Sequence, residues 1–158
     1  MWSRFRSKNN KCVQIKCICH SLALVVKHSF EAHMPDSIAF LLHEVPAHFA
    51  RSTLRREEFL EIQQALGCTG DGTPFNRYVE TRWLARGRVI ETIHANWDTL
   101  CAYFQSIKNQ VPQEQRFKVA RLCEIFLDRS KYCLLMFLLP IVKQFEKINK
   151  LFQVNTNY

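Results

Sequence analysis

Cys17 and His20 are the first residues whose types and spacing could do chemistry, because a thiolate and an imidazole three residues apart can reach one zinc ion. A closed tetrahedral site needs two further ligands, and the candidates are Cys12, His33 and Cys68. The alternative is a structural role, in which Cys17 packs at the end of a strand and His20 bonds locally. We favour the structural role, since two ligands do not hold zinc tightly. We therefore expect no cofactor, with zinc as the alternative.

A second group combines arginines with a tryptophan. Arg82, Trp83, Arg86 and Arg88 follow a glycine-rich loop over residues 67–79, where an expected helix begins. Amides at a helix N-terminus favour a phosphate, arginine binds phosphate through paired hydrogen bonds, and tryptophan stacks on an unpaired base. These four residues are the predicted DNA-binding residues. The alternative places Trp83 in the core and leaves the arginines in solvent.

The sequence contains no recognisable catalytic motif. Its 14 acidic residues form no evident general acid–base pair, and it has no Gly-rich phosphate loop, Gly-x-Ser-x-Gly or His-Glu-x-x-His. A thiol nucleophile at Cys17 or Cys19 beside His20 is disfavoured, because catalytic partners usually meet in the fold rather than along the chain. We therefore expect that the chain is not an enzyme.

The charge of the chain favours a polyanionic partner. Its net charge of +8 points to nucleic acid first and an anionic membrane second. The surplus lies at the two ends and in the middle, because residues 36–74 carry a net charge of −3. A hydrophobic content of 47% excludes a disordered chain. The longest apolar run, residues 133–142, is too short to span a bilayer, so we expect no membrane partner.

Seven cysteines without a secretion signal indicate reduced thiols in the cytosol or nucleus. Three of them, Cys101, Cys123 and Cys133, lie in apolar patterns. We expect these three in the core, as small apolar side chains.

Helical periodicity dominates and predicts an all-α fold of six to seven helices. Expected helices cover residues 22–33, 36–49, 52–66 and 85–107, followed by one that starts at Pro112 and a last one that includes 134–152. Residues 12–18 alternate and predict a short N-terminal strand. Pro46 and Pro140 should kink or shorten their helices, and Gly67 should end the third one.

Apolar seams on these helices define the expected core. The helix from residue 85 carries an unbroken seam of Ile90, Ile93, Trp97, Leu100, Phe104 and Ile107. The next helix gathers Val119, Ala120, Leu122, Cys123, Phe126 and Leu127, with Phe117 and Ile125 outside that arc. The last helix repeats Leu134, Leu138, Ile141, Phe145, Ile148 and Phe152. Two earlier helices present Ile38, Leu41, Val45 and Phe49, and Leu54, Phe59, Ile62 and Leu66.

Several short motifs, taken in the order in which they occur over residues 12–152, resemble those of the hAT transposase superfamily. The family's Cys-x-x-His-x-Leu-x-Leu element matches Cys17, His20, Leu22 and Leu24, and its Thr-Arg-Trp-Leu element matches Thr81, Arg82, Trp83 and Leu84. The helix that follows in the family matches Trp97, Leu100, Tyr103 and Phe104. A Ser-x-x-Arg-x-x-x-Phe pattern matches Ser52, Arg55 and Phe59, and residues 138–152 resemble the last helix of the family's insertion region.

The resemblance implies a division of the chain into two parts. Residues 1–20 would be a β-containing remnant of an RNase H-like core that ends in the Cys-x-x-His element, and residues 21–158 a helical insertion-type domain. Family enzymes hold two metal ions with three separated acidic residues, all outside the matched portion. The chain is therefore expected to be the middle of a longer protein, without catalysis of its own.

In intact relatives the Arg-Trp element is associated with DNA strand ends, a role that the resemblance transfers to Arg82 and Trp83 only. The expected function is residual, non-specific DNA binding by a transposase-derived fragment located in the nucleus. The alternative is a domesticated or degenerate protein-interaction module with no nucleic-acid role. Such a module would associate with itself or with a protein partner, and would stay in the cytosol if no partner carried it to the nucleus.

Overall fold

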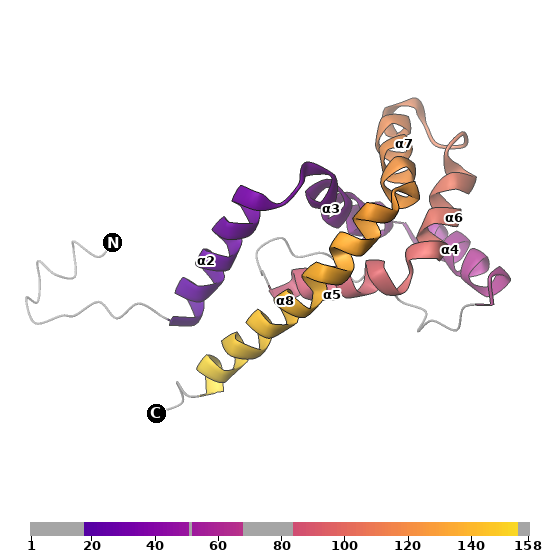
Figure 1. Ribbon diagram of the computed structural model, residues 1–158. Coiled ribbons are helices and arrows are strands. Elements are labelled where there is room, and N and C mark those ends of the chain that lie inside the picture. The colour runs from indigo at the N-terminus through magenta and orange to yellow at the C-terminus, as the bar shows by residue number, and fades with distance from the viewer. Residues whose placement is uncertain (1–17, 51, 68–83, 155–158) are drawn as a thin grey trace, which may run out of the picture.

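A computed structural model describes residues 18–50, 52–67 and 84–154 (Figure 1). Within these residues the chain forms seven α-helices and no strand, which confirms the all-α class. The helices are α2 (Ile18–His33), α3 (Asp36–Ala50), α4 (Thr53–Ala65), α5 (Leu84–Ala95), α6 (Trp97–Ile107), α7 (Gln113–Leu127) and α8 (Arg129–Val154). The expected strand lies outside the described residues except for Ile18, which begins α2. The proposed domain boundary after His20 falls in the first turn of this helix, and the division into two domains stays a prediction.

The core surrounds α6, which contacts α4, α5 and α7. The seam predicted from residue 90 to residue 107 is buried at all six positions. Aromatic rings fill the space between the helices: the Tyr103 ring lies 5.2 Å from Phe49, 5.9 Å from Phe59 and 5.3 Å from Phe104 between centroids. Such tilted and edge-to-face pairs add to the free energy already gained by burying the rings.

The prediction of a single helix over residues 85–107 is wrong in one respect, because Asn96 separates two helices, α5 and α6. The backbone of Asn96 leaves the helical region at φ −114° and ψ 22°. Its side-chain amide donates to the Thr92 carbonyl at 2.9 Å and accepts from Gln63 at 3.0 Å. Asparagine commonly competes with helical hydrogen bonds in this way. The apolar seam continues across the break because the backbone departs from the helix at one residue only.

Helix α3 buries the four residues predicted for its inner face, Ile38, Leu41, Val45 and Phe49. It continues through Pro46 to Ala50, so the proline does not shorten it. Helix α4 buries Phe59 but exposes Leu54 and Leu66. The predicted apolar face is therefore wrong at two of its four positions. Gly67 ends this helix as predicted, with a positive φ of 67° that glycine adopts without strain.

Helix α7 buries Ile125, which the predicted arc excluded, whereas Phe117 is 72% exposed as expected. The reason is that α7 contacts α3, α6 and α8, and three neighbours bury a wider arc than one seam. Of the three cysteines expected in the core, Cys123 is buried, Cys101 is half-buried and Cys133 is exposed. The prediction for Cys133 was wrong because its side of α8 faces solvent.

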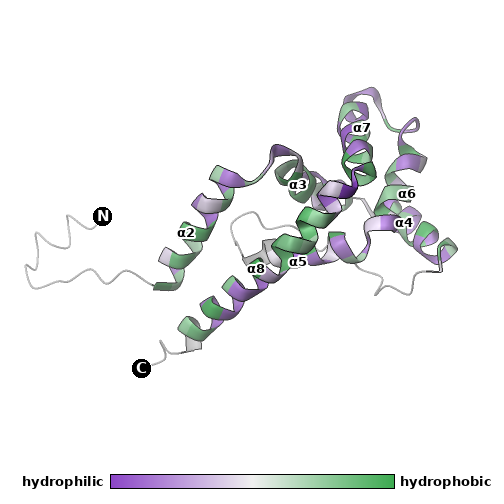
Figure 2. Ribbon diagram, in the orientation of Figure 1, coloured by the Kyte–Doolittle hydropathy of each residue, from purple (hydrophilic) through white to green (hydrophobic). Residues whose placement is uncertain are grey.

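Helix α8 runs through Pro140 without interruption and packs against α5 and α2 (Figure 1). Its most buried positions are Leu135, Val142 and Asn149. The predicted seam is displaced from these by one residue and is only partly covered. Figure 2 shows hydrophobic and hydrophilic residues alternating along the visible side of this helix. No described helix, α8 included, combines the length and the apolar character needed to cross a membrane.

Candidate nucleic-acid interface

The structure describes only part of the predicted DNA-binding group. Arg82 and Trp83 lie outside the described residues, directly before α5. Arg86 lies in the first turn of α5, and its side chain is also outside the described part. Arg88 is described and exposed, two residues further along the same helix. The Arg-Trp element therefore leads into α5, as the sequence predicted.

A glycine brings α5 close to α8. Gly87 is buried, and a Cβ atom built on it would overlap the carboxyl group of Glu146 and press on Val142. Glycine inside a helix costs about 1 kcal/mol relative to alanine, so its presence here has to be matched by closer packing. The absence of a side chain at residue 87 lets the Glu146 carboxyl lie against the α5 backbone.

Basic side chains from two helices influence that carboxyl electrostatically. Burial raises the pKa of Glu146, while the charges of Lys150 and Arg88 act in the opposite direction. The Oε1 atom of Glu146 is buried and has no hydrogen-bond partner. Arg88 of α5 and Lys150 of α8 thus both act electrostatically on Glu146, although 62 residues separate them in the sequence, and neither forms an ion pair with it among the described residues.

Further lysines continue this positive surface along α8. Lys143, Lys147 and Lys150 are exposed and spaced by four and three residues, which places them on one side of the helix. Lys143 donates to Glu91 of α5 at 2.6 Å, and both side chains are about half exposed. We call Arg88, Lys143, Lys147 and Lys150 the α5/α8 basic face. Its four cations exceed the two adjacent carboxylates, Glu91 and Glu146.

The basic face has the chemistry of a phosphate contact surface. Exposed lysine and arginine nitrogens neutralise backbone phosphates of DNA without reading its sequence, and they release bound counterions when they do so. The opposite balance occurs on α4, where Glu57, Glu58 and Glu61 outnumber two arginines. The charge is thus separated between helices rather than evenly spread.

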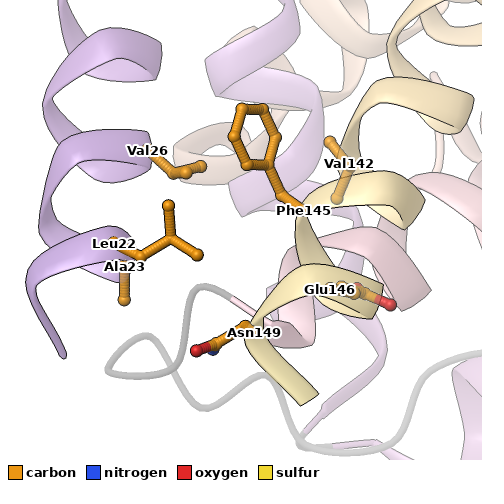
Figure 3. Close-up of a pocket in the computed structure, with 7 residues that line it drawn as sticks. All are labelled: Leu22, Ala23, Val26, Val142, Phe145, Glu146 and Asn149. Atoms are coloured by element: carbon orange, nitrogen blue, oxygen red, sulfur yellow. The ribbon is translucent and has the colours of Figure 1, made fainter. Parts of the chain in front are cut away.

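A small cavity beside this face lies between α2 and α8 (Figure 3). Its volume of about 20 Å³ suits one water molecule and is far too small for a base. Val26 of α2 and Phe145 of α8 face each other across it, and Asn149 lies at one end. Asn149 is 4% exposed, and its Oδ1 has no partner. Its backbone carbonyl accepts a long contact from the Cys19 thiol, 3.9 Å away, so the cavity marks where α2 docks on α8.

The zinc hypothesis loses one of its candidate ligands. His20 and His33 lie in the first and last turns of α2, and 13 residues of helix separate them by about 20 Å. One zinc ion, with bonds to nitrogen of about 2.1 Å, cannot bind both. Cys12, Cys17 and Cys68 lie outside the described residues. Within the described ranges no group of three or more His, Cys, Asp or Glu residues could hold a metal ion, and zinc stays a prediction.

Sequence reasoning missed the three lysines of the basic face. Their spacing of four and three residues was visible in the printed sequence. The prediction for this helix used only its apolar residues, whose seam overlaps the lysines in the sequence. Only the packing of α8 on α5 shows that the lysines and Arg88 belong to one surface.

Comparison of the chain with models of protein families, with curated proteins and with solved structures finds no match. The resemblance to hAT transposases therefore depends on the short motifs alone.

Proposed function

We propose that the chain is a non-catalytic, hAT-type transposase fragment that binds DNA without sequence preference through the α5/α8 basic face. Arg82 and Trp83 directly precede α5 in the sequence, and the proposal assigns them contacts with unpaired bases. Arg86 belongs to the same proposed contact region by its place in the first turn of α5. A nuclear site of action is part of the proposal, because DNA is the proposed ligand.

The observation that supports this proposal best is that α5 packs on α8, with Lys143 bonded to Glu91 at 2.6 Å and four cations exposed on the two helices. The α5/α8 basic face combines Arg88, which the sequence predicted to bind DNA, with three lysines that the sequence prediction did not include. Solvation alone does not require cations from two helices to lie on one surface. A cluster of cations is suited to phosphate binding, since each contact contributes to affinity by counterion release.

A salt titration with matched variants tests the proposal. Binding of a fluorescent 20-base-pair duplex of arbitrary sequence is measured by anisotropy between about 50 and 200 mM NaCl, with an expected Kd on the order of 1 to 100 µM that weakens steeply with salt. Combined Lys143→Gln, Lys147→Gln and Lys150→Gln should lower the slope of log K against log salt by about 3. The control removes three charges from the other end of the molecule, by Lys108→Gln, Arg116→Gln and Lys118→Gln.

The control variant should retain most of the slope, because its substitutions lie on the turn after α6 and on α7. Equal losses in the two triple variants would mean that only the overall charge matters, and would contradict a defined face. No binding at the lowest salt concentration would contradict DNA binding altogether.

A protein-interaction module is the second candidate, and one observation favours it. Large apolar side chains are exposed on α2 and α8, at Ile18, Val25, Phe137 and Leu151 among others. Exposed apolar groups of this size commonly mark contact surfaces. Light scattering across a concentration series distinguishes the candidates: an association that Phe137→Ser abolishes, without DNA binding, would favour the interaction module.

A further inference from the structure

A second cavity lies between α3, α4 and α7, away from the α5/α8 basic face. Its volume is about 390 Å³, within the range of small-molecule sites. The polar and charged side chains that line it are Glu44, His48, Arg55, Glu114, Gln115 and Lys118. Ala47, Val119 and Leu122 complete the lining with apolar surface. The cavity therefore combines several polar groups with an apolar wall.

Arg55 is the cation in this cavity that has no acidic partner among the described residues. Its guanidinium donates to the His48 carbonyl at 3.0 Å and to the Gln115 side-chain oxygen at 2.8 Å, and both acceptors are neutral. The ion pairs among the described residues do not include Arg55. Buried charges in proteins are normally paired, so a half-buried arginine without an ion pair indicates that its guanidinium could bind an anion.

Two of the other lining charges, Lys118 and Glu44, are paired with each other. Lys118 donates to both carboxylate oxygens of Glu44 at 2.9 Å, and His43 lies 3.2 Å from the same carboxylate. Glu114 is exposed in the first turn of α7, where the helix dipole favours a negative charge. Arg55 therefore forms no ion pair with either carboxylate of the described lining, Glu44 or Glu114, although both lie in the same lining.

Hydrogen bonding to neighbouring side chains fixes the position of the Arg55 guanidinium. Tyr103 donates its hydroxyl proton to Glu58 at 3.4 Å, so its oxygen accepts from His48 Nε2 at 3.0 Å. His48 Nδ1 is then the unprotonated nitrogen, and it faces Arg55 Nη1 at 3.5 Å. This ordered chain holds the guanidinium in place before any ligand arrives, and a preorganised donor loses less entropy on binding.

Capping of α3 alone does not explain Arg55. The neighbouring Arg56 donates to the carbonyls of Phe49 and Ala50 at the end of α3, at 3.0 and 3.2 Å. Arg56 is exposed and does not line the cavity. The chain therefore contains two adjacent arginines with similar capping contacts, of which only Arg55 also lines the open, polar cavity.

We propose that the cavity between α3, α4 and α7 binds a small oxyanion, with Arg55 as its principal ligand and Lys118, which is paired with Glu44, as a nearby positive charge. Carboxylates and phosphates share the required chemistry, because both present paired oxygens to a guanidinium. The side-chain amide of Gln115 supplies a further donor. This site is independent of the proposed DNA contact, which uses other helices.

Isothermal titration at constant ionic strength tests the site with two separate probes, inorganic phosphate and acetate. One of them should bind saturably to the whole chain with a Kd on the order of 1 mM, and the comparison tells which oxyanion class is preferred. Arg55→Gln should weaken that binding by about tenfold or more, whereas the matched control Arg56→Gln should leave it within about twofold.

Lys118→Gln supplies a second variant, because this exposed substitution keeps the Arg55 hydrogen bonds in place should Arg55→Gln fail to fold. It should weaken binding by about threefold to tenfold. Equal losses in Arg55→Gln and Arg56→Gln would overturn the proposal, as would an unchanged affinity in Lys118→Gln together with a folded, fully binding Arg55→Gln. The absence of saturable binding by both anions up to concentrations on the order of 10 mM would overturn it as well.

Discussion

The Nε2 atom of His48 lies 3.0 Å from the hydroxyl oxygen of Tyr103, and this hydrogen bond connects α3 to α6 across the core. The His48 ring also packs edge-on against Phe49 and Phe104, with centroids 5.1 Å away in each case. A polar contact is thus enclosed by aromatic rings. Burial in these surroundings, together with the charge of Arg55, lowers the pKa of His48 to about 3.

Acid should destabilise the fold through His48. The folded state holds this imidazole neutral, whereas the unfolded chain protonates it near its ordinary value of 6.5. Its contribution is therefore fully present above pH 6.5 and is lost as the pH falls toward 3, with a limiting slope of about 1.4 kcal/mol per pH unit.

Urea unfolding of the wild type and of His48→Gln between pH 7 and 5 measures this slope, in a window where most carboxylates stay ionised. The wild type should lose stability more steeply than the variant. Parallel curves would show that His48 does not titrate as its burial requires. Exposed His28 provides the control, because His28→Gln should leave the wild-type slope unchanged.

The hydroxyl of Tyr103 should contribute measurably to stability. Tyr103→Phe leaves the aromatic packing in place but removes the acceptor of His48 and the donor to Glu58. Loss of a partner at a half-buried polar group costs about 1 to 3 kcal/mol. Chemical denaturation should report a loss in this range, and the control Tyr132→Phe should be nearly neutral. A neutral Tyr103→Phe would show that water replaces the hydroxyl.

Much of the core could be predicted because its signal is periodic and local. The seam from Ile90 to Ile107 depends only on residue spacing, and burial at every position confirms it. Asn96 was missed because its effect depends on a partner from a distant helix, Gln63. A spacing pattern carries no information about such a partner. The break therefore became visible only in the folded arrangement.

Helix α8 shows a different limit of sequence reasoning. It is apolar over so wide an arc that periodicity alone allows more than one inner face. The packing of α5 and α2 selects Leu135, Val142 and Asn149. The choice depends on Gly87, whose missing side chain lets α5 approach, and no periodic pattern identifies a contact of this kind. The same packing brings Arg88 to the lysines.

The contact between Gly87 and Glu146 should appear as a change of sign in a double-mutant cycle. In the wild type, Gly87→Ala crowds the Glu146 carboxyl and should cost about 1 to 3 kcal/mol. In a Glu146→Ala background only the contact with Val142 remains tight, and the same substitution should then stabilise α5 by up to about 0.5 to 1 kcal/mol if Val142 shifts slightly. Thermal or urea unfolding of the four proteins gives the coupling energy. Additive effects would mean that the two helices are further apart than described.

Glu146 should oppose both stability and DNA binding at neutral pH. Burial raises its pKa, so the folded state favours the protonated form. Its unfavourable contribution is absent below the unfolded value of 4.5 and develops as the pH rises through the folded pKa. Glu146→Gln should therefore stabilise the protein at pH 7, and this advantage should disappear at pH 4.

The same substitution removes a negative charge from the α5/α8 basic face. DNA affinity at low salt should increase severalfold, since one repulsive charge is lost beside the phosphates. Glu124→Gln, an exposed change of equal charge on α7, is the control and should have a smaller effect. An equal effect of the two substitutions would argue against a phosphate contact near Glu146.

Trp83 should distinguish unpaired DNA from duplex. The proposal assigns this residue a contact with an unpaired base, and stacking of this kind contributes about 1 to 3 kcal/mol. Trp83→Ala should therefore weaken binding to a single strand or a hairpin end by about 5-fold to 150-fold, while duplex binding changes little. Anisotropy with the three DNA forms measures this, and Trp2→Ala serves as a matched control. If Trp83→Ala unfolds the protein, Trp83 is a core residue, and the loss would then extend equally to all three DNA forms.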